Sequence, residues 1–200
     1  PLNYRVSQKN VATNPDSVAW DKSLFGPVLH TLGTLSIPSL TYPVFLPTPE
    51  GGLQFLMRQG GSGGGDKMLY RYNPSLSDWA LVRQIDSRSG NFVDAYGTST
   101  RRNSYPNDYQ YDGAGRLHGT WCWREGAWAI NHSINYAYSD DQGNTWHNNA
   151  GTTLSLPMRV TSPGLVAIPL STRYGLINDQ AQAVDSQGRV HVVMYHSQQE

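Results

Sequence analysis

Residues 136–146 read YAYSDDQGNTW, and this stretch decides the expected fold. Its aromatic start alternates like a half-buried β-strand, and its polar remainder has the residue types of a tight hairpin turn. Asp141 can accept backbone N–H groups, Gly143 can adopt a positive φ, and Trp146 can pack beneath the turn between sheets. The stretch therefore predicts a β-hairpin whose turn is fixed by its own side chains.

Outside this hairpin the chain repeats itself. Residues 70–79 (YRYNPSLSDW) also run from an aromatic strand through a polar turn to a tryptophan. Residues 51–54 (GGLQ), 115–118 (GRLH) and 188–191 (GRVH) are three copies of one phrase, each opening a strand after a turn, at separations of 64 and 73 residues. A period of about 65 to 70 residues that holds about four strands is typical of a large propeller blade.

The remaining pattern predicts an all-β fold. Apolar residues alternate or form short runs between clusters of Gly, Pro, Asn and Asp, and no window keeps a helical period. We expect strands at residues 53–58, 68–72, 117–124, 133–139, 165–169 and 189–196. We predict one partial β-propeller domain, residues 1–200, of four-stranded blades at about 35–100, 101–165 and 166–200, the last incomplete. Because propellers close with roughly four to eight blades, we expect the remainder of a parent propeller as a partner.

Composition excludes several classes of partner. The 15 basic and 15 acidic residues cancel, and there is no basic run, so nucleic acid is not expected. No stretch approaches the ~18 apolar residues of a membrane span. The single Cys122 cannot form an intrachain disulfide and does not identify a compartment. Because the chain starts at Pro1 without a signal peptide, we interpret it as a processed or excised segment.

The strand at residues 117–124 (LHGTWCWR) carries the first candidates for chemistry. Alternation places His118 and Arg124 on one face and Trp121 and Trp123 on the other. An imidazole can exchange a proton near neutral pH, and a guanidinium can bind a carboxylate bidentately. Each side chain could instead be a hydrogen-bonded structural residue.

A second histidine, His132, precedes the strand at 133–139 and is the other catalytic candidate. The glycine-rich run at 58–67 lacks the following helix and the Lys-Ser/Thr ending of a phosphate-binding loop, so we expect a flexible loop at a blade mouth. His118 and Cys122 lack the spacing of a zinc site. We predict no metal site and no cofactor, and leave a structural divalent metal open.

Several of these motifs together resemble the BNR-repeat family, the Asp-box or sialidase-like β-propellers that include ulvan lyases and related secreted polysaccharide lyases. Residues 139–146 fit the Asp-box pattern SxDxGxTW, and the resemblance extends over about residues 35–196. The other motifs are Thr41-Tyr42-Pro43, residues 58–63, Tyr105-Pro106, residues 117–124, Asn131-His132, residues 178–180 and residues 185–191.

This resemblance implies a seven-bladed parent, a secreted or periplasmic location and an acidic polysaccharide substrate. The implied reaction is β-elimination at a uronic acid of an ulvan-like chain. A base removes the C5 proton, a cation neutralises the carboxylate, and an acid assists departure of the C4 oxygen.

The resemblance also implies a set of site residues. The expected catalytic residues are His118, His132, Tyr195 and Arg124. The expected substrate-binding residues are Arg58, Ser62, Tyr105, Trp121, Trp123, Asn131 and Asn178. We expect His118 and His132 to face one shared mouth as acid and base, with Arg124 or Arg58 on the uronate.

Two alternatives stay open at this point. A sialidase-like glycoside hydrolase needs an arginine triad, a tyrosine nucleophile and a glutamate, and hydrolysis normally uses paired carboxylates, whereas Glu125 is the only obvious acidic residue near the candidates. A carbohydrate-binding propeller without catalysis would keep only the aromatic groove.

Overall fold

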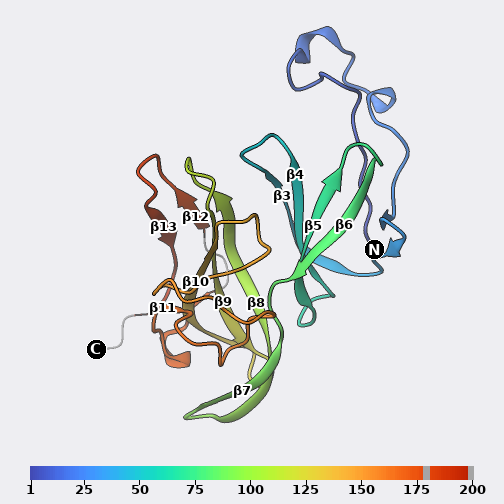
Figure 1. Cartoon of the computed structure of the whole chain (residues 1–200). Coiled ribbons are helices and arrows are strands. Elements are labelled where there is room, and N and C mark those ends of the chain that lie inside the picture. The colour runs from blue at the N-terminus through green and yellow to red at the C-terminus, as the bar shows by residue number, and fades with distance from the viewer. Residues whose placement is uncertain (178–180, 198–200) are drawn as a thin grey trace.

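The computed structural model describes residues 1–177 and 181–197, and its regular structure is almost entirely β-strand (Figure 1). The helices of these two ranges are single 3-10 turns. They are η1 (Pro15–Ser17), η2 (Lys22–Leu24) and η3 (Thr172–Tyr174). No helix in the described part of the chain has the length and apolar character of a membrane span. The predicted all-β class is confirmed.

Within the described ranges, the strands form two large antiparallel sheets and two small ones, each in chain order. The first large sheet contains β3 (Leu40–Pro47), β4 (Leu53–Gln59), β5 (Asp66–Asn73) and β6 (Asp78–Gln84). The second contains β7 (Ser89–Asp94), β8 (Gly97–Tyr111), β9 (Leu117–Glu125), β10 (Ile130–Ser139) and β11 (Val166–Ile168). The small sheets are β1 (Thr31–Leu32) with β2 (Leu35–Ser36), and β12 (Ala181–Val184) with β13 (Val190–Val193).

The sheets are arranged as propeller blades. Strand β8 contacts β3 on one side and β12 on the other, so these three strands of successive sheets lie next to one another (Figure 1). The first blade is β3–β6, the second is β8–β11, and β12–β13 begin a third. Strand β7 is an addition to the second blade. The chain is therefore part of a β-propeller with four-stranded blades.

The apolar core lies between the blades. Leu56 and Leu69 of the first blade pack against Trp121, Trp123 and Trp146 of the second. A second cluster joins the N-terminal segment to the first blade, and a third joins the second blade to β12–β13. The odd-numbered residues of β9 face the first blade and the even-numbered residues face the third, as the alternation predicts.

Each blade has two ends with different contents. We call the end with the β4–β5 and β9–β10 turns (residues 59–66 and 125–130) the mouth, and the opposite end the base. The hairpin turn at 139–146 lies at the base. Asp141 Oδ1 accepts the Thr145 amide at 2.8 Å, Gly143 has a φ of 87°, and the buried Trp146 donates to the Gly143 carbonyl at 3.1 Å. These are the predicted contacts, and their role is to close the turn.

Candidate functional site

The inner strands of both complete blades carry a Tyr-Pro pair near the mouth. Tyr42-Pro43 lies on β3 and Tyr105-Pro106 on β8, and the pairing register shifts across the first pair and directly after the second. Proline cannot donate to the ladder, so each pair lies at or beside a bulge, and bulges redirect side chains. Tyr42 has a φ of 55°, and its ring lies edge-on to that of Tyr105 with centroids 5.4 Å apart. The two bulges thus bring a tyrosine from each blade to one point.

Arg58 fills the space beside these two rings. Its guanidinium carbon lies 4.8 Å from the centroid of each ring, and the side chain is almost completely buried. Nε donates to Thr41 Oγ1 at 2.9 Å, and Nη1 donates to the Ser104 carbonyl at 3.4 Å. Arg58 therefore holds a permanent positive charge against both tyrosines.

A cavity of about 350 Å³ opens at this point between the two blades. Its lining residues are Tyr42, Ser62, Gly63, Arg101, Asn103, Tyr105, Arg124, Glu125, Gly126 and Ala129. We call it the mouth cavity. Arg101 and Arg124 are its cationic groups, and the buried Asn103 Oδ1 accepts no hydrogen bond from the described residues. The volume and the few convergent polar groups suit a small charged ligand such as a sugar acid.

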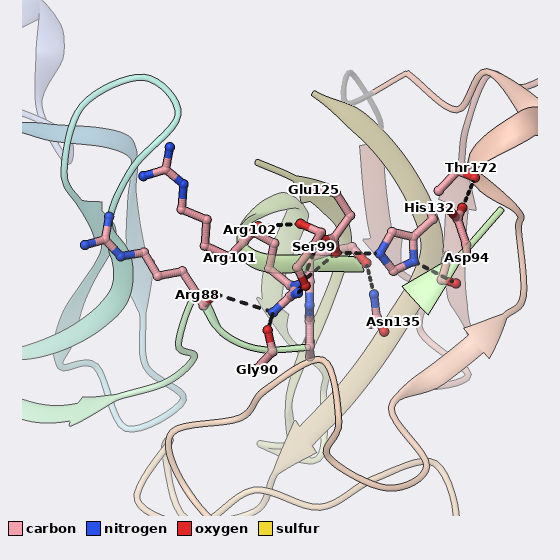
Figure 2. A network of polar contacts seen from close by, with 12 residues as sticks. Arg88, Gly90, Asp94, Ser99, Arg101, Arg102, Glu125, His132, Asn135 and Thr172 are labelled. Atoms are coloured by element: carbon pink, nitrogen blue, oxygen red, sulfur yellow. Dashed lines mark hydrogen bonds and ion pairs between the residues drawn. The ribbon is translucent and has the colours of Figure 1, made fainter. Parts of the chain in front are cut away.

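Behind the cavity wall, a buried network surrounds Glu125 (Figure 2). Its carboxylate accepts two hydrogen bonds from Arg102, at 2.7 and 3.1 Å, and lies 2.9 Å from His132 Nε2. Burial alone would raise the pKa of Glu125, but the hydrogen bonds from His132 and Arg102 outweigh it and lower the pKa. The His132 ring stacks on Phe92 with centroids 3.9 Å apart. Glu125 is thus ionised, and both of its carboxylate oxygens have hydrogen-bond partners.

Two further arginines lie at the same end. Figure 2 shows the side chains of Arg88 and Arg101 extending together from the network toward the first blade. The Arg88 amide is fixed by Asp66 Oδ1 at 2.9 Å, and both side chains are exposed. With Arg124 they give the mouth a cationic rim.

His118 lies at the base, in a side-chain network around a turn. Its Nε2 is 3.0 Å from Asp112 Oδ2 and its Nδ1 is 2.9 Å from the Tyr136 hydroxyl. The other carboxylate oxygen of Asp112 accepts the amides of Ala114 and Arg116 at 2.9 and 2.8 Å. One aspartate thus joins the histidine to the β8–β9 turn.

The same arrangement recurs in the third blade. His191 Nε2 lies 2.9 Å from Asp185 Oδ2, and Asp185 Oδ1 accepts the amides of Gln187 and Arg189 at 2.9 and 3.0 Å. We call this unit the Asp-His clamp. Its recurrence shows that the repeated phrase at 115–118 and 188–191 fixes a hairpin turn.

The two predicted catalytic histidines are far apart. His118 pairs with Tyr138 at the base, and His132 pairs with Trp123 at the mouth, five residues or ~17 Å along β9. They also lie on opposite faces of the sheet, since His132 contacts the odd-numbered Glu125 of β9. The expectation that they share one mouth is wrong, because the antiparallel register places the two strand starts at opposite ends.

Other predicted residues do meet at the mouth. Ser62, Tyr105 and Arg124 line the cavity, and Arg58 lies beside it. Asn131 is buried near this end, where its amide donates to the Leu176 carbonyl at 2.8 Å.

Four predicted residues lie elsewhere in the fold or outside the described residues. Trp121 and Trp123 are buried in the core between the blades, so their interpretation as groove residues is wrong. Asn178 lies outside the described residues. Tyr195 is exposed just beyond β13, and its carbonyl accepts the Ile177 amide at 3.1 Å.

Sequence reasoning missed Tyr42, Arg101 and Asn103 as site residues. The recurrence of the Tyr-Pro pair on two inner strands was a usable signal for Tyr42. Arg101 and Asn103 belong to a polar strand without any pattern. In the described ranges, no group of three or more His, Cys, Asp or Glu side chains could hold a metal ion.

Comparisons with known proteins agree with this architecture. A family model described as "BNR repeat-containing family member" matches residues 1–200. The crystal structure of polysaccharide lyase Uly1 superimposes with a TM-score of 0.61 at 21% identity, covering 81% of this chain and 36% of that chain. A PL25 ulvan lyase, solved alone and bound to -[GlcA(1-4)Rha3S]-, gives TM-scores of 0.66 and 0.65 at 14% identity, covering 88% of this chain and 40% of that chain.

No curated protein matches the sequence. The chain spans about two fifths of the length of these solved lyases. At such identities the likeness establishes the propeller fold and leaves the chemistry to be argued from the mouth cavity.

Proposed function

Because this chain belongs to the BNR repeat-containing family, we propose that it acts at its mouth cavity on an acidic polysaccharide, as a lyase that cleaves beside a uronic acid. The single observation that carries the proposal is the convergence of two tyrosines and several arginines from two blades on one cavity. A secreted or periplasmic location and an ulvan-like substrate are parts of the same proposal.

The charges of the cavity suit a uronate. Arg124 and Arg101 line it, and a guanidinium binds a carboxylate bidentately. Arg58 adds a fixed positive charge beside the tyrosines, while Glu125 is neutralised by Arg102. Asn103 Oδ1 offers an acceptor for a sugar hydroxyl. The net field of the cavity is therefore positive, and it favours an anionic sugar residue.

The same groups suit β-elimination. Binding of the carboxylate by Arg124 makes the C5 proton more acidic, because the negative charge that develops on the carboxylate is stabilised. We assign Tyr42 as the base, since its hydroxyl belongs to a partly exposed ring beside Arg58, whose charge stabilises a phenolate. The C5–H bond breaks, a C4–C5 double bond forms, and the C4–O bond breaks, with Tyr105, which lines the cavity, as the proton donor to the leaving oxygen. Tyr195 of the next blade is the second candidate for this donor.

The test is the ultraviolet absorbance of the conjugated double bond on mixing with ulvan and other uronates. Tyr42→Phe should lower kcat by about 100-fold or more, the usual contribution of a positioned acid or base. Arg124→Ala should lower kcat/KM by at least a similar factor. The matched control is Arg116→Ala, an exposed arginine at the base, which should change neither. No absorbance change with any uronate would refute the lyase.

One observation favours binding without catalysis as a second candidate. His118 is part of an Asp-His clamp and His132 is bonded to Glu125, so neither imidazole lines the cavity. Calorimetric binding of a uronate oligosaccharide without any new double bond would support this candidate. A hydrolase is not favoured, because Glu125 is the single carboxylate among the described residues that line the cavity, and Arg102 holds it.

A further inference from the structure

An arm extends from the second blade beside the mouth cavity. Strand β8 pairs with β9 only from Arg102 onward, and its first part pairs with β7 instead. The hairpin of β7 with residues 97–101 therefore projects beyond the sheet, at the lower end of the view in Figure 1. Tyr96 lies at its tip.

The end of this arm that joins the sheet is fixed by the buried network. Arg102 Nη1 donates to the carbonyls of Ser89 and Gly90 at 3.1 and 3.0 Å, and Nη2 donates to the Ser99 carbonyl at 3.1 Å. Phe92 of the arm stacks on His132. These contacts hold the arm in one position, and a preorganised surface loses less entropy when it binds a ligand.

The tip is fixed as well. Asp94 Oδ1 accepts the Tyr96 amide at 2.8 Å, and the other oxygen of Asp94 accepts a hydrogen bond from the Thr172 hydroxyl (Figure 2). The Tyr96 ring lies 5.7 Å from that of Trp128 at an interplanar angle of 44°. Tyr96 is 52% exposed, and Trp128 is half-buried. The two rings thus form an aromatic surface open to solvent.

This aromatic surface adjoins the mouth cavity. Trp128 belongs to the β9–β10 turn, whose residues Gly126 and Ala129 line the cavity. Neighbouring Cα atoms are ~3.8 Å apart, so the backbone of Trp128 begins directly at the cavity rim. Arg101, also at the rim, is bonded through its carbonyl to the Gly126 amide at 2.9 Å. A ligand that extends out of the cavity past this turn meets the two rings next.

We propose that Tyr96 and Trp128 form a stacking subsite for a sugar residue of the same polysaccharide chain, beyond the disaccharide that the mouth cavity holds. Rings of this kind offer an apolar face to the C–H face of a sugar and a polar edge to water. The inference rests on the proposed function, because it takes the ligand of the cavity to be a polysaccharide. It adds a second contact point, so longer chains bind more tightly than short ones.

The test compares two oligosaccharides from one uronate polysaccharide by calorimetry on the full chain. We expect Trp128→Ala and Tyr96→Ala each to weaken binding of a hexasaccharide by about three- to tenfold, in line with typical aromatic contacts. Binding of a disaccharide that fills only the cavity should not change. Trp20→Ala is the matched control, since Trp20 is 66% exposed and lies in the N-terminal segment.

The outcomes separate the two proposals. Hexasaccharide affinity unchanged in both variants, equal loss for both oligosaccharides, or no binding by the unaltered protein would overturn the subsite. Length-dependent binding that both variants lose, without any double bond formed, would uphold the subsite and refute the lyase. Tyr96→Ala covers the case in which Trp128→Ala unfolds, because Tyr96 lies at the exposed tip.

Discussion

At the scale of single residues, two arginine–carboxylate ion pairs of similar geometry lie in different environments. Arg102 binds Glu125 through two hydrogen bonds inside the protein, and Arg116 binds Asp140 through two hydrogen bonds at the surface. The first pair is fully buried, whereas the side chains of the second are 41% and 51% exposed. Similar geometry should therefore have unequal energetic consequences.

Glu125→Gln should lower the free energy of unfolding by about 3 to 5 kcal/mol, because Arg102 would keep its charge without a buried counter-charge. Asp140→Asn should cost less than about 1 kcal/mol, because water solvates the released Arg116. Urea denaturation of the two variants measures both values. Equal losses would show that burial does not decide the strength of these pairs.

At the scale of elements, the Asp-His clamp reverses the sequence-based interpretation of His118. Asp112 joins His118 to the backbone amides of the β8–β9 turn. Asp185 joins His191 to the corresponding turn of the third blade. His118→Ala should lower the free energy of unfolding by about 1 to 3 kcal/mol, the penalty for leaving a buried polar partner unbonded. Activity per folded molecule should remain.

Thermal unfolding and initial rates on a uronate polysaccharide check this prediction together. His191→Ala is the control, because its clamp is exposed and should contribute less. Full stability of His118→Ala with complete loss of activity would restore the catalytic interpretation.

Sequence patterns predicted some of the strands and missed others. All six expected strands exist, because each has the alternation or the turn signals of a blade. The long β8 was missed, since it is rich in polar residues and contains Pro106 at a bulge. Its buried positions are largely polar, so apolar periodicity does not mark it. Arg101 and Asn103 belong to this strand, which is why these two cavity residues could not be predicted.

The site was predicted least well where it depends on register. Face alternation placed Arg124 correctly with the even-numbered residues of β9. It could not tell which end of the sheet each histidine occupies, because that depends on strand direction. It also could not tell that Trp121 and Trp123 face a neighbouring blade instead of a ligand.

At the scale of the whole molecule, a buried lysine links the two complete blades. Lys67 of β5 donates to the Tyr109 hydroxyl at 2.8 Å and lies 3.5 Å from Asp86 Oδ2. Ser104 of the second blade donates to the same Asp86 oxygen. Burial, partly offset by Asp86, lowers the pKa of Lys67 to about 8.

This lowered pKa predicts an unusual pH dependence. Between pH 8 and 10.5 the unfolded chain keeps a proton on Lys67 that the folded chain has released, so the free energy of unfolding rises with pH. A shift of this size corresponds to about 3 kcal/mol at most. Burial raises the pKa of Cys122 to about 12 and that of Tyr109 well above 10, so neither neighbour titrates in this interval.

Denaturation at several pH values between 8 and 10.5, in the unaltered protein and in Lys67→Met, isolates this contribution. The difference in slope between the two proteins should be positive over that interval. Parallel curves would mean that Lys67 titrates alike in the folded and unfolded chains.

The stack of Tyr42, Arg58 and Tyr105 limits how such a protein can be rearranged. One blade supplies the guanidinium and one ring, and its neighbour supplies the other ring. Exchanging or duplicating a single repeat would therefore divide the constellation, however well the new repeat folded. Only two adjacent repeats moved together would carry all three side chains into another scaffold. The smallest unit that can be transferred with this arrangement intact is therefore a pair of blades.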